Sequence, residues 1–314
     1  MITVPLVDLH RHLEGAMRTS TVLDIARRAG HPLPDAPRER FVATSRLAGL
    51  LPYLDRVDAP AELVRTAEGW TRVAREVVLD AYDDGLRAVE LRFSPWFVQS
   101  RTELAPEAVI DAVVEGVAQA QELVDLPVGL IGIMLRDLGP DGALPQLASI
   151  LSRRDAFVAI DIAGNEAGYP AGDFAPAYAK AHEAGLRLTA HAGEAAGPAS
   201  VWAAVRELGV ERVGHGVRAA EDPRLMEHLA EHRIALEVAI TSNVQSGAAA
   251  SFAEHPVRTL LRHGVQVTLN TDNPRASNVT LSHEYDVAAT RAGLTADDVE
   301  TIARNAVEAS FVLG

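Results

Sequence analysis

Short apolar runs alternate with longer amphipathic segments along the whole chain. The longer segments repeat apolar residues at helical spacing, as in residues 61–83 and 107–123, which predicts helices. Glycines such as Gly85 and Gly185 follow these segments, where they would end a helix before the next run. The apolar runs predict eight strands, at approximately Leu6–His12, Ala88–Ser94, Val128–Leu135, Phe157–Gly164, Leu186–Glu194, Arg212–Gly216, Ala235–Asn243 and Val265–Asp272.

Eight strand–helix repeats predict the fold. Strands that alternate with helices form parallel sheets, and eight such repeats close into a (β/α)₈ TIM barrel of the α/β class. No low-complexity linker or block of charge divides the chain, so we expect a single domain over residues 1–314. The segment of about Thr19–Gly69 is predicted to be a helical insertion after the first strand, near the barrel mouth.

Composition narrows the function classes. Apolar residues make up 48% and charged residues 23% of the chain, which is typical of a soluble globular protein. There are no cysteines, which excludes disulfides, thiolate zinc sites and a cysteine nucleophile. The net charge of −14 argues against binding nucleic acid or an anionic membrane surface. The longest uncharged runs, such as Pro127–Leu135, are too short to span a bilayer, and Met1–Pro5 does not resemble a secretory signal, so we expect a cytoplasmic protein.

Polar residues that can do chemistry follow most of the predicted strands. In a TIM barrel the C-terminal ends of all strands meet around one mouth, where active sites lie. Polar groups buried there need partners, because an unpaired buried group costs roughly 1–3 kcal/mol. A metal ion or a substrate would supply them. These residues are His10, His12, Arg92, Arg136, Gly164, Asn165, Glu166, His191, Glu194, His215, Ser242, Asn243, Thr271 and Asp272.

Four of these residues form a candidate metal site. His10 and His12 are two residues apart on the first strand, so both imidazoles face the barrel interior. A hydrogen-bonded histidine pair would explain that spacing alone. His191 and Asp272, at the ends of the fifth and eighth strands, complete a set of three nitrogens and one oxygen that suits Zn²⁺ and leaves a position for water. Iron, cobalt and manganese also remain compatible with these ligand types.

The remaining histidines differ in their setting. His215 lies between Gly214 and Gly216, which permit close approach of the backbone, and this favours a ligand nearby. The others fall in loops or amphipathic segments and are expected to be solvated: His31, His182, His228, His232, His255, His263 and His283.

The candidate residues lie in six short motifs. They are Asp8-Leu9-His10-Arg11-His12-Leu13-Glu14-Gly15, Asp161-Ile162-Ala163-Gly164, His191-Ala192-Gly193-Glu194, Val213-Gly214-His215-Gly216, Thr241-Ser242-Asn243 and Leu269-Asn270-Thr271-Asp272-Asn273-Pro274. These motifs resemble those of the adenosine deaminase family of the amidohydrolase superfamily. The resemblance covers nearly the whole chain, and the motifs follow the family's order.

The resemblance implies a role for each matching residue. Glu194 resembles the acid that donates a proton to purine N1, and His215 the group that orients the attacking water and helps to deprotonate it. Gly164 resembles the backbone donor to purine N3. Zinc would lower the pKa of water toward ~7, which permits attack on C6 of an aminopurine at neutral pH. The implied ligands of one Zn²⁺ per chain are His10, His12, His191 and Asp272.

Three positions depart from the family pattern. Asn273 replaces the second of two aspartates, and its amide can donate to purine N7 without being protonated. Glu14 replaces an aspartate that contacts the ribose 5′-hydroxyl, which indicates a different 5′ environment. Ala239-Ile240 replaces Cys-Pro, a change of packing.

The resemblance therefore implies hydrolytic deamination of a small-molecule 6-aminopurine nucleoside, adenosine or a 5′-modified adenosine. The alternatives are 6-aminodeoxyfutalosine of menaquinone biosynthesis, whose carboxylate Arg218 or Arg275 could bind, and free adenine. Both arginines also fit ordinary surface charges. A metal-dependent ester or amide hydrolase would leave the positions of Glu194 and Gly164 unexplained. The sequence leaves the oligomeric state open.

Overall fold

The computed structural model describes residues 4–313, and within them eight parallel strands form one sheet in chain order. This arrangement confirms the predicted (β/α)₈ barrel. Of Met1–Pro5, where no secretory signal is expected, residues 1–3 lie outside the described residues. The strands are β1 (Val7–His12), β2 (Ala88–Phe93), β3 (Val128–Leu135), β4 (Ala159–Ala163), β5 (Arg187–Ala192), β6 (Arg212–His215), β7 (Ala235–Val238) and β8 (Val267–Leu269).

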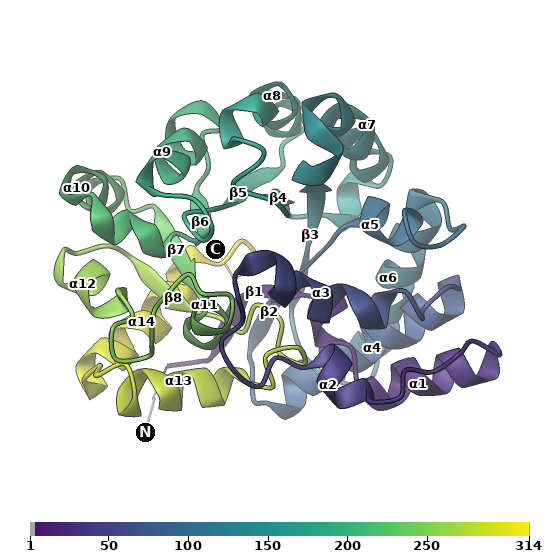
Figure 1. Cartoon of the computed structure of the whole chain (residues 1–314). Helices are drawn as coiled ribbons and strands as arrows, with labels where there is room; N and C mark the ends of the chain where they lie inside the picture. Colours follow the sequence, from purple (N-terminus) through teal and green to yellow (C-terminus); the bar gives the residue numbers. More distant parts are fainter. Residues whose placement is uncertain (1–3, 314) are drawn as a thin grey trace.

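Helices surround the strands (Figure 1). Most of them connect one strand to the next, as the helical periodicity predicts. Among the described residues no helix is both long and apolar enough to cross a membrane. The α-helices are α1 (Thr19–Arg28), α2 (Pro37–Phe41), α3 (Leu50–Ala61), α4 (Ala67–Asp83), α5 (Pro95–Gln99), α6 (Pro106–Gln121), α7 (Gly139–Leu151), α8 (Ala175–Glu183), α9 (Pro198–Glu207), α10 (Pro223–Glu231), α11 (Ile240–Gln245), α12 (Val257–Arg262), α13 (Leu281–Thr290) and α14 (Ala296–Ala309).

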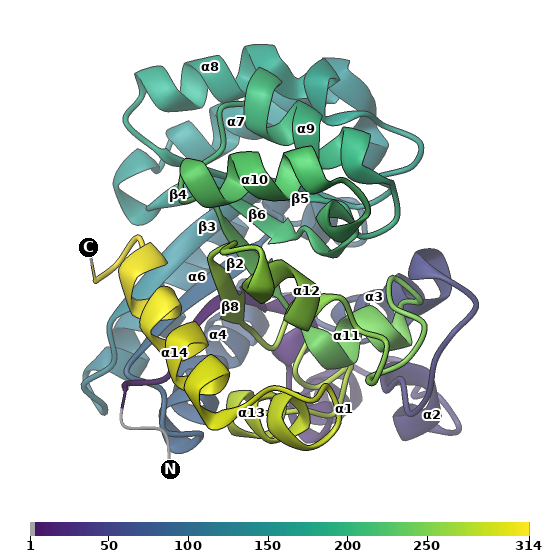
Figure 2. The same ribbon diagram turned by 90° about the vertical axis from the view of Figure 1, so that its left-hand side faces the viewer.

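The predicted insertion after the first strand is present as α1, α2 and α3. Figures 1 and 2 together place α3 and α11 at one end of the barrel, the end where the strands finish. The last turn of α14 leads toward the opposite end (Figure 2). Of the insertion, α3 therefore lies at the mouth of the barrel.

The barrel closes where the first and last strands meet. The backbone N–H of His12 donates to the carbonyl of Asp272 at 2.7 Å, and the N–H of Asp272 donates to the carbonyl of His10 at 2.8 Å. Backbone hydrogen bonds therefore join candidate ligands from the two ends of the sequence.

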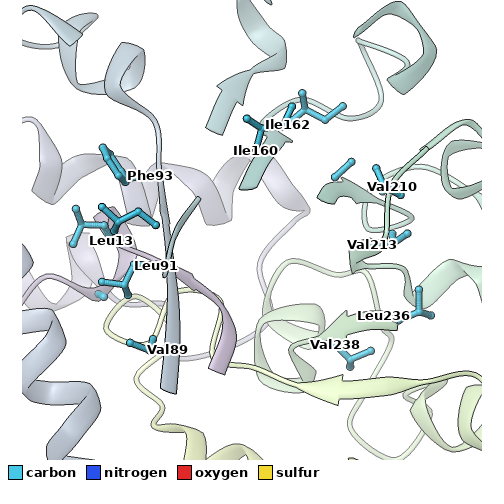
Figure 3. Packing of buried hydrophobic residues seen from close by; sticks show 14 of the residues in the cluster. Leu13, Val89, Leu91, Phe93, Ile160, Ile162, Val210, Val213, Leu236 and Val238 are labelled. Carbon is cyan, nitrogen blue, oxygen red and sulfur yellow. The ribbon is translucent and has the colours of Figure 1, made fainter. Parts of the chain in front are cut away.

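Strand β2 shows how side chains divide between two layers. Val89, Leu91 and Phe93 face the helices and belong to the apolar core in Figure 3, together with residues of β4, β6 and β7. Glu90 and Arg92 alternate with them and point into the barrel, where both are fully buried. TIM barrels are usually filled by branched apolar side chains. This barrel instead carries charged groups directly beneath its mouth.

The seventh strand is shorter than the predicted Ala235–Asn243. It ends at Val238, and the second half of that run forms α11. The N–H of Asn243 donates to the carbonyl of Ala239 at 2.8 Å, which closes a helical turn. A short apolar run does not by itself distinguish a strand from a buried helix.

Candidate active site

A cavity of about 450 Å³ opens at the C-terminal ends of the strands. Of the residues proposed from sequence for the site, all but His10 line this cavity, and His10 is fully buried next to them. The proposed residues that line it are His12, Glu14, Gly164, His191, Glu194, His215, Asp272 and Asn273. The structure thus brings together residues from both ends of the sequence, and just beside them the backbone N–H of Thr271 donates to Oδ1 of Asp8, 263 positions earlier, at 3.3 Å.

The candidate metal ligands converge on one point. The Nε2 atom of His12 lies 3.3 Å from Nε2 of His10 and 3.1 Å from Nε2 of His191. Oδ1 of Asp272 lies 3.4 Å from Nε2 of His10 and 3.2 Å from Nε2 of His12. Separations slightly above 3 Å are those of neighbouring ligand atoms around an ion with bonds of about 2 Å.

Carboxylates behind the imidazoles fix which nitrogen faces that point. Nδ1 of His10 lies 2.9 Å from Oε2 of Glu237, and Nδ1 of His191 lies 2.8 Å from Oδ2 of Asp161. A carboxylate that accepts the Nδ1 proton leaves Nε2 as a bare lone pair. Lone pairs and a carboxylate oxygen this close together repel unless a cation lies between them, so the donor set fits a divalent transition metal.

Two buried arginines hold these carboxylates in their charged form. Arg92 donates to Asp161 at 2.8 Å and to Glu237 at 2.7 Å, and Arg212 donates to Glu237 at 2.7 Å and to Glu90 at 2.5 Å. Burial alone would raise the pKa of Asp161 and Glu237, but the nearby histidines and arginines keep both pKa values below the ordinary range. Sequence analysis did not identify Glu237, because nothing in its local sequence shows which way it points.

Local backbone strain marks two positions of the site. Asp272 has a φ of 57° and His215 a φ of 60°, left-handed conformations that residues with a side chain rarely adopt. The second oxygen of Asp272 accepts a hydrogen bond from Ser242 Oγ at 2.5 Å and lies 3.4 Å from the hydroxyl of Tyr53. The strain is compensated by contacts that orient Asp272 toward the histidines.

Glu194 is a buried carboxyl group beside this cluster. Its Oε2 lies 3.6 Å from Nε2 of His215, and its Oε1 is buried without a hydrogen-bond partner among the described residues. Burial, reinforced by the negative charge of Asp272, raises the pKa of Glu194 to about 8. A carboxyl group with such a pKa carries a proton at neutral pH and can donate it.

Glu166, which sequence analysis noted only as a polar residue at a strand end, shapes the loop that carries Glu194. Its carboxylate accepts backbone N–H groups of Gly193, Glu194, Ala195 and Ala196 at 2.5 to 3.1 Å. A carboxylate surrounded by four N–H donors is held firmly in one place. Glu166 thereby sets the position of the loop and of the Glu194 backbone.

Gly164 and Asn273 both line the cavity, and the backbone at Gly164 and beside Asn273, at Gly15, has no space for a Cβ atom. Gly164 has a φ of 106°, and a Cβ atom there would lie 2.1 Å from an oxygen of Asp137. A Cβ on Gly15 would lie 1.9 Å from Oδ1 of Asn273. Glycine at both positions allows the cavity-lining groups to approach the backbone closely.

Glu14 is held at one oxygen and free at the other. Its Oε1 accepts the backbone N–H of Ser94 at 2.9 Å, whereas Oε2 is buried and has no partner among the described residues. Burial raises the pKa of Glu14 above its ordinary value. One oxygen therefore remains available to a group that enters the cavity.

Arg218 and Arg275 do not line this cavity. Arg218 forms an ion pair with Glu221, and Arg275 forms one with Asp80, as expected for surface charges. The arginine that does line the cavity is Arg101, whose sequence context gave no signal.

The expectation that His255 is solvated is wrong. Only 4% of its surface is exposed, and its Nε2 lies 3.2 Å from Oδ1 of Asn243. The short segment between α11 and α12 folds back against α11, and polar composition alone does not reveal such packing.

Comparison with known proteins agrees with the site. The family model described as Adenosine deaminase matches residues 5–313. The adenosine deaminase of Serratia proteamaculans is 43% identical over 313 residues, which cover 98% of this chain and 94% of that protein. The crystal structure of an adenine deaminase from Arthrobacter aurescens superposes with a TM-score of 0.91 at 28% identity, covering 98% of this chain and 94% of that one.

A zinc-containing amidohydrolase from Burkholderia ambifaria superposes with a TM-score of 0.90 at 28% identity, covering 98% of this chain and 86% of that one. Family, relatives and fold thus agree with a histidine–aspartate cluster at the barrel mouth. The chain is a metal-dependent aminohydrolase, and it belongs to the adenosine deaminase family.

Proposed function

We propose that this protein deaminates a 6-aminopurine nucleoside, adenosine or a 5′-modified adenosine, with one Zn²⁺ per chain. The observation that carries the proposal is Glu194, a buried carboxyl with a raised pKa beside four convergent ligand atoms. An ester or amide hydrolase on the same barrel would leave the combined positions of Glu194 and Gly164 unexplained. The ligands would be His10, His12, His191 and Asp272, and the zinc in the Burkholderia structure supports this metal.

Different groups of the site would perform different steps of the reaction. Bound Zn²⁺ would supply Lewis acidity that makes water a better nucleophile at neutral pH. Glu194 would donate its proton to purine N1, which removes the negative charge that develops as water oxygen bonds to C6. The C6–N bond then breaks and ammonia leaves. Of the two water protons, one restores Glu194 and one departs with the amino group, so the balance closes.

Other residues would hold the purine in place. The N–H of Gly164 would donate to N3 and the amide of Asn273 to N7, both from the lining of the cavity. His215 would orient the attacking water from its position beside Glu194. These contacts fix the ring so that C6 meets the water and N1 meets Glu194.

The shape of the cavity favours a nucleoside over free adenine. Its lining extends from the ligand cluster past Glu14 to Leu50, Leu51 and Leu54 of α3, beyond the groups assigned to the purine. The fold similarity to an adenine deaminase makes the base the second candidate. A base would leave the outer half of the cavity unfilled.

Glu14 supports tolerance at the 5′ position. Its side chain is one C–C bond longer than the aspartate it replaces, which changes the space for a compact 5′-hydroxyl. We expect 5′-deoxyadenosine and 5′-extended adenosines to have kcat/KM values at least equal to that of adenosine. An extended substrate such as 6-aminodeoxyfutalosine would reach toward Arg101, which lines the outer cavity.

The experiment measures ammonia release from adenosine, adenine, 5′-deoxyadenosine, methylthioadenosine and 6-aminodeoxyfutalosine with zinc-loaded enzyme. Deamination of the nucleosides supports the proposal, and exclusive turnover of adenine contradicts it. A preference for adenosine over 5′-deoxyadenosine of more than about 100-fold, or ~2.7 kcal/mol, would show that the 5′-hydroxyl is required.

A further inference from the structure

A chain of three polar residues runs from solvent-excluded backbone to His215. Nδ1 of His215 lies 2.9 Å from Nδ2 of Asn243, and Oδ1 of Asn243 lies 3.2 Å from Nε2 of His255. Nδ1 of His255 lies 3.1 Å from the backbone nitrogen of Val257. His215, Asn243 and His255 are all buried. The hydrogen positions along this series of hydrogen bonds follow from its end at the backbone of Val257.

The fixed end is the backbone of Val257. A backbone N–H can only donate, so Nδ1 of His255 must accept and carries no proton. Burial lowers the pKa of His255 to about 3, which keeps the ring neutral. A neutral imidazole with a bare Nδ1 has its proton on Nε2. His255 therefore donates from Nε2.

That donor settles the orientation of the Asn243 amide. Nε2–H of His255 needs an acceptor, so the amide oxygen must face His255 and the NH₂ group must face His215. The NH₂ group can only donate, which makes Nδ1 of His215 an acceptor. The proton of neutral His215 is therefore on Nε2, the atom that faces Glu194 at 3.6 Å.

Rotation of the amide by 180° would break the series of hydrogen bonds at His255. The amide oxygen would then face Nδ1 of His215, while the NH₂ group would face the protonated Nε2 of His255, where two donors would meet. Buried donors left unpaired cost about 1–3 kcal/mol each. The chain therefore has one satisfied arrangement.

We infer that Asn243 and His255 are positioning residues that hold His215 in its Nε2–H tautomer, so that His215 donates a hydrogen bond at the reaction centre and does not ligate the metal. The inference rests on the proposed deaminase function. His215 needs such a restraint, because its ring lies with His10, His191 and Asp272 in a group whose ligand atoms are within 4.8 Å of one another. An imidazole ligates through a bare nitrogen, which an Nε2 proton prevents.

The same restraint defines what His215 contributes to the reaction. With Nδ1 occupied by Asn243 and Nε2 protonated, neutral His215 has no free lone pair to take a proton from water. Its remaining role is to direct an N–H toward the oxygen that attacks C6. The expected help in deprotonating water is thereby replaced by orientation of that oxygen.

The direct test is nitrogen NMR of the histidine rings, which reports protonation of Nδ1 and Nε2 separately. We would label the protein with ¹⁵N-histidine and assign the His215 signals from their loss in His215→Gln. In metal-free and in zinc-loaded protein, His215 should show a protonated Nε2 and a bare Nδ1. A protonated Nδ1 would overturn the inference. This measurement uses no substrate, so it stands apart from any failure of the proposed function.

Asn243→Asp is the sharpest variant, because a carboxylate of the same shape accepts on both sides. It should draw the proton of His215 to Nδ1 and leave Nε2 bare, and with Co²⁺ bound the visible absorption spectrum should change as His215 gains access to the metal. We expect kcat to fall about 10- to 100-fold, the usual effect of a group behind the reacting residues, with KM within about threefold. An unchanged tautomer and unchanged kcat in a folded Asn243→Asp protein would refute the role of Asn243.

Two variants of His255 provide a matched pair that does not place a charge in the interior. Gln at position 255 can donate to Asn243 and accept from Val257, so His255→Gln should retain most of the kcat and the Nε2–H tautomer. Phe at this position fills similar space but has neither a hydrogen-bond donor nor an acceptor, so His255→Phe should lower kcat and populate both tautomers of His215. Equal kcat values and identical tautomers in the two variants would show that His255 acts only by packing.

Discussion

The inner and outer halves of the cavity are built in different ways. In the inner half the imidazoles of His10 and His191 are held from behind by carboxylates that are themselves held by arginines. In the outer half Glu14 has an oxygen without a partner among the described residues, and the side chain of Leu51 on α3 is 59% exposed. Asp58 and Arg101 form an ion pair there that is partly open to solvent.

This difference indicates that the inner half serves turnover and the outer half serves substrate preference. Atoms that must meet a metal and a reacting carbon are fixed by several contacts each, because small displacements are costly for chemistry. Atoms that meet the far end of the substrate keep free hydrogen-bonding capacity. Changes in the inner half should therefore affect turnover, and changes in the outer half should affect substrate preference.

Removal of an inner ligand should have the largest effect. His12→Ala leaves three candidate ligands, and we expect most of the bound metal to be lost and kcat/KM for adenosine to fall at least ~10³-fold, or about 4 kcal/mol of transition-state stabilisation. Metal analysis and steady-state kinetics on the same preparation measure both. His182→Ala, at an exposed histidine, is the control. Full metal content in His12→Ala would remove His12 from the ligand set.

Glu194→Gln should separate proton donation from metal binding. The amide keeps the shape of the side chain but cannot give up a proton in this way, so kcat should fall at least ~10²-fold while metal content stays at the wild-type level. Glu183→Gln, at an exposed position of α8, provides the matched control. If metal and activity are lost together, Glu194 supports the metal site and is not the proton donor.

Asp161→Asn tests whether the inner half depends on its buried charges. The amide would face the Nδ1 of His191 and leave Arg92 without one of its partners. We expect metal affinity to fall about 10- to 100-fold and the free energy of unfolding to fall by about 3–5 kcal/mol. Metal titration and denaturant unfolding measure these, with the exposed Asp125→Asn as reference. Wild-type affinity in Asp161→Asn would show that His191 is oriented without Asp161.

Glu14→Asp tests the outer half and should have the smallest effect. The shorter side chain restores the residue that the family commonly has, so the preference for adenosine over 5′-deoxyadenosine should rise about three- to tenfold, the value of one net hydrogen bond. The ratio of the two kcat/KM values is the measurement. A parallel fall for both substrates would mean that Glu14 supports the chain at Ser94 and does not contact the 5′ group.

The sequence predicted the barrel and the residues around its mouth because short local patterns in the sequence indicate both. Each strand is a run of apolar residues that ends in a polar group, and His10 and His12 share a face through their spacing alone. The end of β7 at Val238 was not predictable, because a short buried segment such as the one that forms α11 is compatible with either a strand or a helix.

The support behind the site could not be predicted from single positions. Glu237 and Arg212 lie in the neighbouring strands β7 and β6, in which a charge normally argues for an exposed face, and only closure of the barrel brings Glu90 of β2 to Arg212 at 2.5 Å. His255 is another such residue, because its partners Asn243 and Val257 become neighbours only after the chain turns between α11 and α12. Long-range pairing of buried polar groups leaves no local pattern.

The hydrogen bonds that join His10 and His12 to Asp272 also have a consequence for biosynthesis. A nascent chain that has emerged through β7 already carries three of the four proposed ligand residues, yet it lacks the proposed oxygen ligand Asp272 and the strand that closes the barrel. A domain generally folds as one unit, so the strands of this barrel reach their final places only when β8 is available. The complete set of ligands arises only when the end of β8 docks on β1, so acquisition of the metal and closure of the barrel are one late event in the life of the chain.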